Sequence, residues 1–209
     1  VSAGSRVSGR LPFEPGTTAL PTAAVLARSR VTIVPPDGRA GLRPTVATIG
    51  ADNSFVSPTV VPSRYTIGPP ILPGWSVKSV THAGRELSGS SVQVTSDVTD
   101  VVITYTDKAG ELAGSVPKAD TDVDVVAFLV PVATQSASPY DLGRMRTVAV
   151  SSDGTFAFGG VVPGDYAVVV IAAPPAARTD ALIASWLARG TRITLGDREK
   201  RSVTLSIIR

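Results

Sequence analysis

The chain has 209 residues, of which 43% are apolar, no cysteine and a formal net charge of +3. Without cysteine it can form neither disulfides nor thiolate metal sites. Its Lys and Arg residues are spread along the chain, which argues against a nucleic-acid partner because such proteins usually carry a basic stripe. Its apolar runs are too short and too often broken by proline to span a bilayer.

The first half of the chain contains short segments rich in Val, Ile and Thr, separated by Gly, Pro and Asn. Such segments predict β-strands joined by turns. The strands are expected at residues 5–12, 30–34, 45–49, 54–56, 64–68, 76–81, 92–95 and 101–105. The Pro- and Thr-rich stretch between residues 12 and 30 is predicted to be a loose loop.

The second half continues the pattern, with strands expected at residues 111–116, 122–130, 146–150, 155–158, 166–173, 192–195 and 202–207. About seven strands per hundred residues is typical of a β-sandwich. One helix is predicted over residues 179–189, because Leu182, Trp186 and Leu187 share a face and Gly190 stops it. We expect this helix to pack across an open end of the second sandwich.

A similar sequence motif occurs twice, as DNSFVSPTVVPSRYTI from Asp52 and as DGTFAFGGVVPGDYAVVV from Asp153, 101 positions apart. Each copy predicts a tight turn at its Asp, then a strand with buried Phe, then a second turn and strand. Tyr65 and Tyr166 are expected to anchor the corner through a hydroxyl hydrogen bond. A weaker similarity relates VSGRL, near the N-terminus, to LAGSV at Leu112.

The long spacing indicates two copies of a whole domain, and not a solenoid repeat. We therefore expect a first sandwich over residues 1–106 and a second over residues 107–209. The boundary near residues 106–110 is too short for a flexible spacer, so the domains should sit close together. The absent initiator Met and leader suggest a piece of a longer protein.

DGTFAFGGVVPGDYAVVV resembles the signature of carboxypeptidase-regulatory-like domains, in which Asp-Gly is followed by Phe and then by Pro-Gly-x-Tyr. LAGSVPKADTDVDVVAFLVP resembles the opening strands of the same family. The resemblance implies an all-β chain of two tandem transthyretin-like (prealbumin-like) Greek-key β-sandwiches, in the carbohydrate-binding-like fold group. The first copy departs from the signature at Asn53 and at Ser63-Arg64. The family module is non-catalytic, so no functional residues can be carried over.

His82 is the only histidine and the only candidate for a hydrolase centre. A catalytic triad needs a nucleophile and an orienting acid beside the imidazole. His82 lies in the polar stretch THAGRE without a G-x-S-x-G elbow nearby. The alternative, an exposed histidine in a turn, is the interpretation the sequence favours.

Asp120, Asp122 and Asp124 could place three carboxylates on one side of a strand, since side chains alternate along a strand. Clustered oxygen ligands suit calcium, but the loop lacks the EF-hand pattern. Solvated loop charge is the simpler interpretation, and no resident metal or cofactor is predicted.

Trp75 and Tyr140 are candidates for stacking on the apolar face of a sugar. Trp186 is assigned to the core instead, because it lies on the apolar face of the predicted helix. A sugar site requires convergent groups that a sequence alone does not show.

These observations predict a non-enzymatic structural or interaction module of a larger bacterial envelope or secreted protein. Its partners would be other domains of the parent polypeptide, and glycans or envelope proteins are further candidates. The alternatives are a carbohydrate-binding module, a hydrolase using His82, and a transthyretin-like ligand carrier formed by dimerisation.

Overall fold

A computed structural model of the chain describes residues 4–35, 42–87, 90–117, 124–132, 145–172 and 180–208. Asp120, Asp122 and Tyr140 lie outside these residues. The chain divides into two compact units, Val1–Asp107 and Lys108–Arg209, which are described separately below.

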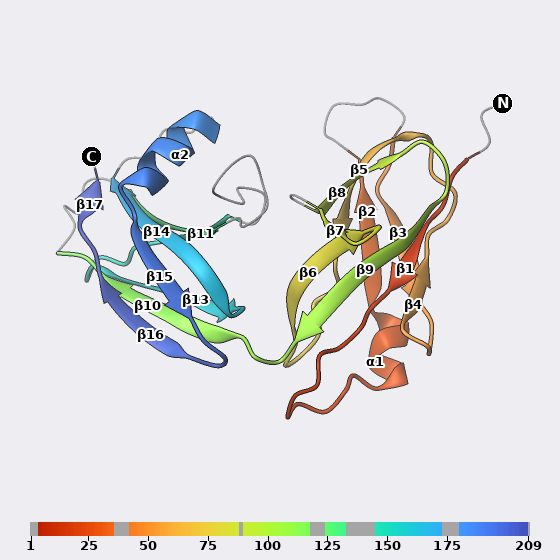
Figure 1. Ribbon diagram of the computed structural model, residues 1–209, viewed down its shortest axis with the longest axis horizontal. Helices are drawn as coiled ribbons and strands as arrows, with labels where there is room; N and C mark the ends of the chain where they lie inside the picture. The colour runs from red at the N-terminus through yellow and green to blue at the C-terminus, as the bar shows by residue number, and fades with distance from the viewer. Residues whose placement is uncertain are drawn as a thin grey trace. The chain divides into compact units, whose positions relative to one another are not determined.

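The first unit is built mainly of β-strands (Figure 1). In chain order its elements are β1 (Val7–Arg10), α1 (Ala23–Arg28), β2 (Arg30–Val34), β3 (Thr45–Ile49), β4 (Ser54–Val56), β5 (Ser63–Gly68), β6 (Ser76–His82), β7 (Arg85–Glu86), β8 (Ser91–Val94) and β9 (Val98–Thr106). They form one continuous sheet in the order β7-β6-β9-β1-β4-β3-β2-β5-β8. This sheet curls around a single core, so that its two halves face each other as the layers of a sandwich do.

The second unit has two separate sheets. Its elements are β10 (Gly110–Ser115), β11 (Val125–Pro131), β12 (Arg146–Ala149), β13 (Thr155–Val161), β14 (Gly164–Ala172), α2 (Asp180–Ala188), β15 (Thr191–Leu195), β16 (Lys200–Thr204) and β17 (Ile207–Ile208). One sheet has the order β13-β10-β16, and the other β12-β11-β14-β15 with β17 paired to β14. Phe156 and Phe158 of the first sheet are buried against Val168 and Val170 of the second, as the alternating pattern predicted.

The two units share one seven-strand topology. In each, the first strand pairs antiparallel with the fourth and parallel with a strand near the end of the unit. These partners are β4 and β9 for β1, and β13 and β16 for β10. The order β3-β2-β5-β8 of the first unit recurs as β12-β11-β14-β15 in the second. The all-β fold class of two tandem sandwiches is thus confirmed. The units differ where the first inserts the β6–β7 hairpin and the second inserts α2.

The outer faces of the matching four-stranded sheets carry different chemistry. In the second unit Phe128 lies opposite Val169 on this face, and both are buried beneath Trp186 of α2. The corresponding pair in the first unit is Thr32 opposite Gly68. The second unit therefore needs α2, because without this helix the apolar face of its sheet would contact water.

Two helix predictions need correction. The helix α2 covers the outer face of the β11–β14 sheet and not an open end of the sandwich. A second helix, α1, lies within the stretch that the sequence assigned to a loose loop. Thr22 caps it by accepting a hydrogen bond from Val25 N at 3.4 Å, and Leu26 anchors it in the core. Six residues are too few to show a helical period in sequence.

Candidate functional site

The repeated turns at Asp52 and Asp153 have the same internal hydrogen bonds. The Oδ1 atom of Asp153 accepts from the backbone N of Thr155 at 3.0 Å and from its hydroxyl at 2.7 Å. Asp52 Oδ1 accepts the equivalent bonds from Ser54 at 3.1 and 2.7 Å. The hydroxyl bond, followed by the amide bond, holds the pKa of each carboxyl below its ordinary value. These carboxylates therefore act as turn-forming groups.

The repeated tyrosines close the second turn of each copy of the motif through a hydroxyl hydrogen bond, as the sequence predicted. Tyr166 donates its hydroxyl to the carbonyl of Val162 at 2.6 Å, and Tyr65 donates to Val61 at 2.8 Å. Burial raises the pKa of Tyr65 above its ordinary value. Both hydroxyls thus have a structural role, because a buried hydroxyl requires a hydrogen-bond partner.

A glycine in the opening strand of each unit makes room for the repeated phenylalanine. Gly114 lies opposite Phe156 across the β10–β13 ladder, and Gly9 lies opposite Phe55 across β1–β4. A methyl group at position 114 would come within 2.0 Å of the Phe156 ring. The glycine that VSGRL and LAGSV share is therefore required for packing.

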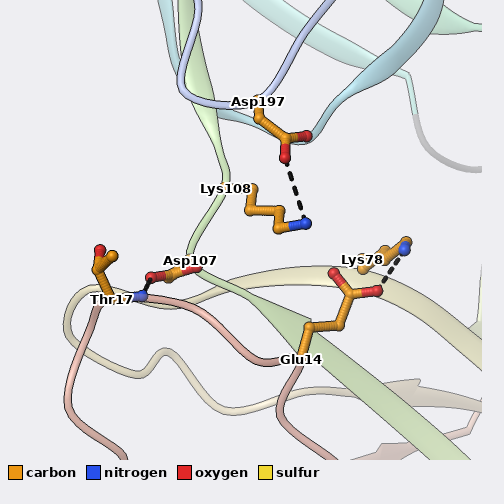
Figure 2. Close-up of polar contacts among 6 residues, drawn as sticks. All are labelled: Glu14, Thr17, Lys78, Asp107, Lys108 and Asp197. Atoms are coloured by element: carbon orange, nitrogen blue, oxygen red, sulfur yellow. Dashed lines mark hydrogen bonds and ion pairs between the residues drawn. The ribbon is translucent and has the colours of Figure 1, made fainter.

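A second polar cluster lies at the end of β9 in the first unit (Figure 2). Asp107 is 8% exposed, and its Oδ2 atom accepts from the backbone N atoms of Thr17 and Thr18, both at 2.8 Å. Gly16 allows this approach, since a Cβ there would lie 2.0 Å from Asp107 Oδ1. Nearby, Lys78 forms an ion pair with Glu14.

Three aromatic rings pack beside this cluster. The ring of Phe13 stands edge-on to Trp75 at 4.9 Å and stacks on Tyr105 at 5.4 Å between centroids. Tyr105 donates its hydroxyl to the carbonyl of Pro70 at 2.7 Å, and burial raises its pKa. The Trp75 indole donates to the carbonyl of Ala19 at 3.3 Å. This is a packed and hydrogen-bonded cluster that fixes the segment after β1.

Lys78 also has a special place in its strand. The β6–β9 register shifts between Val77 and Ser79, so Lys78 is the bulged residue. A bulge with a charged side chain discourages further strand pairing. β7 pairs with β6 only at Thr81 and His82. Lys78 therefore lies in the part of β6 that β7 does not cover.

His82 lies at the end of β6, opposite Arg85 in the β6–β7 hairpin. The imidazole forms no hydrogen bond with any of the residues that the structure describes. The nucleophile and orienting carboxylate of a triad are therefore not brought to it within this part of the chain.

The acidic row can be followed only at Asp124, which is exposed. Asp120 and Asp122 lie outside the described residues, so the calcium site stays a prediction. Within the described ranges, no group of three or more His, Cys, Asp or Glu residues could hold a metal ion.

The two candidate stacking residues have different outcomes. Trp75 is only 7% exposed, so the prediction of an exposed platform is wrong for this ring. Its indole donates to the carbonyl of Ala19, and its ring packs against Phe13. Tyr140 lies outside the described residues, and its stacking role stays a prediction. Trp186 is a core residue of the second unit, as its place on the helix indicated.

No family model matches the chain, and no curated protein matches it. Solved structures that are similar include a streptococcal ancillary pilin, with 12% identity over 100% of this chain and 63% of that chain and a TM-score of 0.36. The minor pilin of Streptococcus agalactiae has 13% identity over 97% of this chain and 94% of its own, with a TM-score of 0.35. A DUF3823 family protein from Parabacteroides merdae has 14% identity over 82% and 92%, with a TM-score of 0.33. The chain spans under two thirds of the first of these, and the fold assignment rests on its own strand pairing.

No helix in the described part of the chain is long and apolar enough to cross a membrane.

Proposed function

We propose that the chain is a non-enzymatic structural and interaction module of a larger bacterial envelope or secreted protein, composed of two carboxypeptidase-regulatory-like units. The observation that carries the proposal is the internal use of the repeated polar groups. Asp153 is bonded to Thr155, and Tyr166 to Val162, so the signature residues hold turns in place. Their counterparts in the first unit form the same bonds.

The position of His82 supports the same conclusion. A catalytic triad needs a nucleophile and an orienting carboxylate within hydrogen-bond reach of the imidazole, and the described residues supply neither. The residue opposite His82 in the β6–β7 hairpin is Arg85, which is not the orienting carboxylate of a triad.

The test of the non-enzymatic assignment uses the purified chain with chromogenic ester, peptide and glycoside substrates at pH 5 to 8. We expect the same substrate conversion as in buffer alone. The variant His82→Ala and the matched variant Arg85→Ala, its cross-strand neighbour, should behave identically. Turnover that is present in the wild type and Arg85→Ala but abolished in His82→Ala would overturn the proposal.

The envelope assignment needs a separate experiment on cells that express the parent protein. An antibody raised against this chain should stain intact cells, and external protease should remove the epitope. Epitope recovered only after lysis, in the cytosolic fraction, would contradict an envelope or secreted location without affecting the non-enzymatic assignment.

A further inference from the structure

The segment between β1 and α1 is held at both ends by core residues. Leu11 is fully buried and Leu26 is 3% exposed. Between them, residues 15–22, here called the strap, contribute no buried side chain, and Leu20 within it is 64% exposed. The strap is therefore attached to the first unit with little apolar burial of its own.

The strap is held mainly by polar contacts with groups of the sheet. The Asp107 carboxylate accepts from the amides of Thr17 and Thr18, and the Ala19 carbonyl accepts from the Trp75 indole. Figure 2 shows the Asp107 carboxylate directed at Thr17. Asp107 accepts two of these bonds, both at 2.8 Å, so it is the principal latch.

Release of the strap would leave the sheet intact. The ladder between β6 and β9 and the bridge between Phe13 and Tyr105 do not include strap residues. The groups that would gain contact with water are the Asp107 carboxylate and the indole edge of Trp75 that Ala19 now faces. Segments with few buried contacts are those that open locally below the global unfolding free energy.

We propose that the strap is a separable lid: it opens independently of the sheet, the Asp107 carboxylate latches it shut, and its opening uncovers the indole of Trp75. The aromatic side chain that the sequence suggested as a binding platform is thus buried in the closed state and exposed in the open one.

Hydrogen exchange of the whole chain tests this proposal. In the wild type, the Thr17 and Thr18 amides should exchange by an opening that depends weakly on urea, whereas amides of β9 should require global unfolding. The variant Asp107→Ala should speed exchange at Thr17 and Thr18 by at least about tenfold, and Asp107→Asn by less. The β9 amides should change by under about threefold in both variants.

Trp75 gives an independent readout in a Trp186→Phe background, which removes the other tryptophan. Acrylamide quenching of Trp75 should increase by at least about twofold in Asp107→Ala. The matched control is Asp97→Ala, which removes another carboxylate that accepts a backbone amide, from Arg6 at 2.8 Å. It should leave both the strap exchange and the Trp75 quenching unchanged.

Two results would overturn the lid. One is strap exchange in the wild type with the same urea dependence as β9, which would mean that the strap opens only on global unfolding. The other is unchanged strap exchange in both Asp107 variants. Because the wild-type measurement stands alone, the proposal remains testable even if Asp107→Ala fails to fold.

Discussion

Asn53 and Gly154 occupy the same position in the two repeated turns, with φ of 63° and 84°. This left-handed backbone is unfavourable for most residues, but Gly and Asn tolerate it. The departure of the first copy from the Asp-Gly signature is therefore conservative in backbone terms. The turn bonds from Asp52 and Asp153 to the following hydroxyl residue are retained in both units.

The lowered pKa of Asp153 predicts an acid-sensitive contribution to stability. Because the folded-state pKa lies below the unfolded value, the stabilisation is complete above about pH 4 and is lost as the pH falls through the folded-state pKa. Asp153→Asn should be less stable than the wild type at pH 6, and the difference should shrink towards pH 2. Urea midpoints followed by Trp186 fluorescence in a Trp75→Phe background measure this, and a pH-independent difference would contradict it.

The tip of the β6–β7 hairpin contains a strained residue. Ala83 has φ of 49°, next to Gly84 with φ of 75°, as in the two-residue turns that favour Asn-Gly. Ala83→Gly should raise the free energy of unfolding of the first unit by about 0.5–1 kcal/mol, because the strain is relieved. Ala157→Gly, in the extended strand β13, is the matched control and should destabilise. Urea unfolding compares the two, and destabilisation by Ala83→Gly would refute the strain.

At the scale of elements, the units join their sheets by different means. In the first unit β3 and β4 form a short ladder, with Thr48 opposite Val56. In the second unit the side chain of Arg146, on β12, donates to the carbonyls of Gly159 and Gly160 at 2.7 and 3.3 Å. A guanidinium can bridge two acceptors in this way because its donors are fixed in a plane.

The two strand glycines should differ in their tolerance of a methyl group. At Gly9 a Cβ would lie 1.9 Å from the backbone oxygen of Val101, whereas at Gly114 it would meet the Phe156 ring. A ring can rotate away more easily than backbone can move. Gly114→Ala should cost about 1–3 kcal/mol and Gly9→Ala more. Thermal or urea unfolding measures both, and an equal or reversed order would disprove this explanation.

Strands were the most predictable elements because their signals are local. Alternating burial and flanking turn residues predicted β2, β3 and β4 with the bounds that the structure shows. The single strand predicted over residues 202–207 is instead divided into β16 and β17, which belong to different sheets. Apolar residues continue through this break, so the sequence pattern does not show the change of sheet.

The polar cluster at Asp107 could not be predicted. An aspartate after a strand is ordinary in a turn, and Thr17 and Thr18 lie 90 and 89 residues away in sequence. The signal in the sequence, Gly16 beside two threonines, is common to many loops. Trp75 was ambiguous for a similar reason, since burial of an indole depends on the distant segment that covers it.

At the scale of the whole molecule, the two units have separate cores and one tryptophan each. Trp75 belongs to the core of the first unit and Trp186 to the second. Tyr166→Phe removes a buried hydrogen bond and should cost about 1 kcal/mol. It should lower the urea midpoint reported by Trp186, measured in a Trp75→Phe background, and leave that reported by Trp75, in Trp186→Phe, unchanged. Equal shifts of both midpoints would show that the units unfold as one.

The contrast between Thr32–Gly68 and Phe128–Val169 has a consequence for protein engineering. A chimera with the α2 sequence in place of the β6–β7 hairpin would lack the Phe–Val pair against which Trp186 packs in the second unit. Conversely, deletion of α2 would expose the apolar face around Phe128 to water and make the protein prone to aggregation. Transplanting the helix would therefore require Thr32→Phe and Gly68→Val together with it, so the helix and the surface beneath it form one transferable unit.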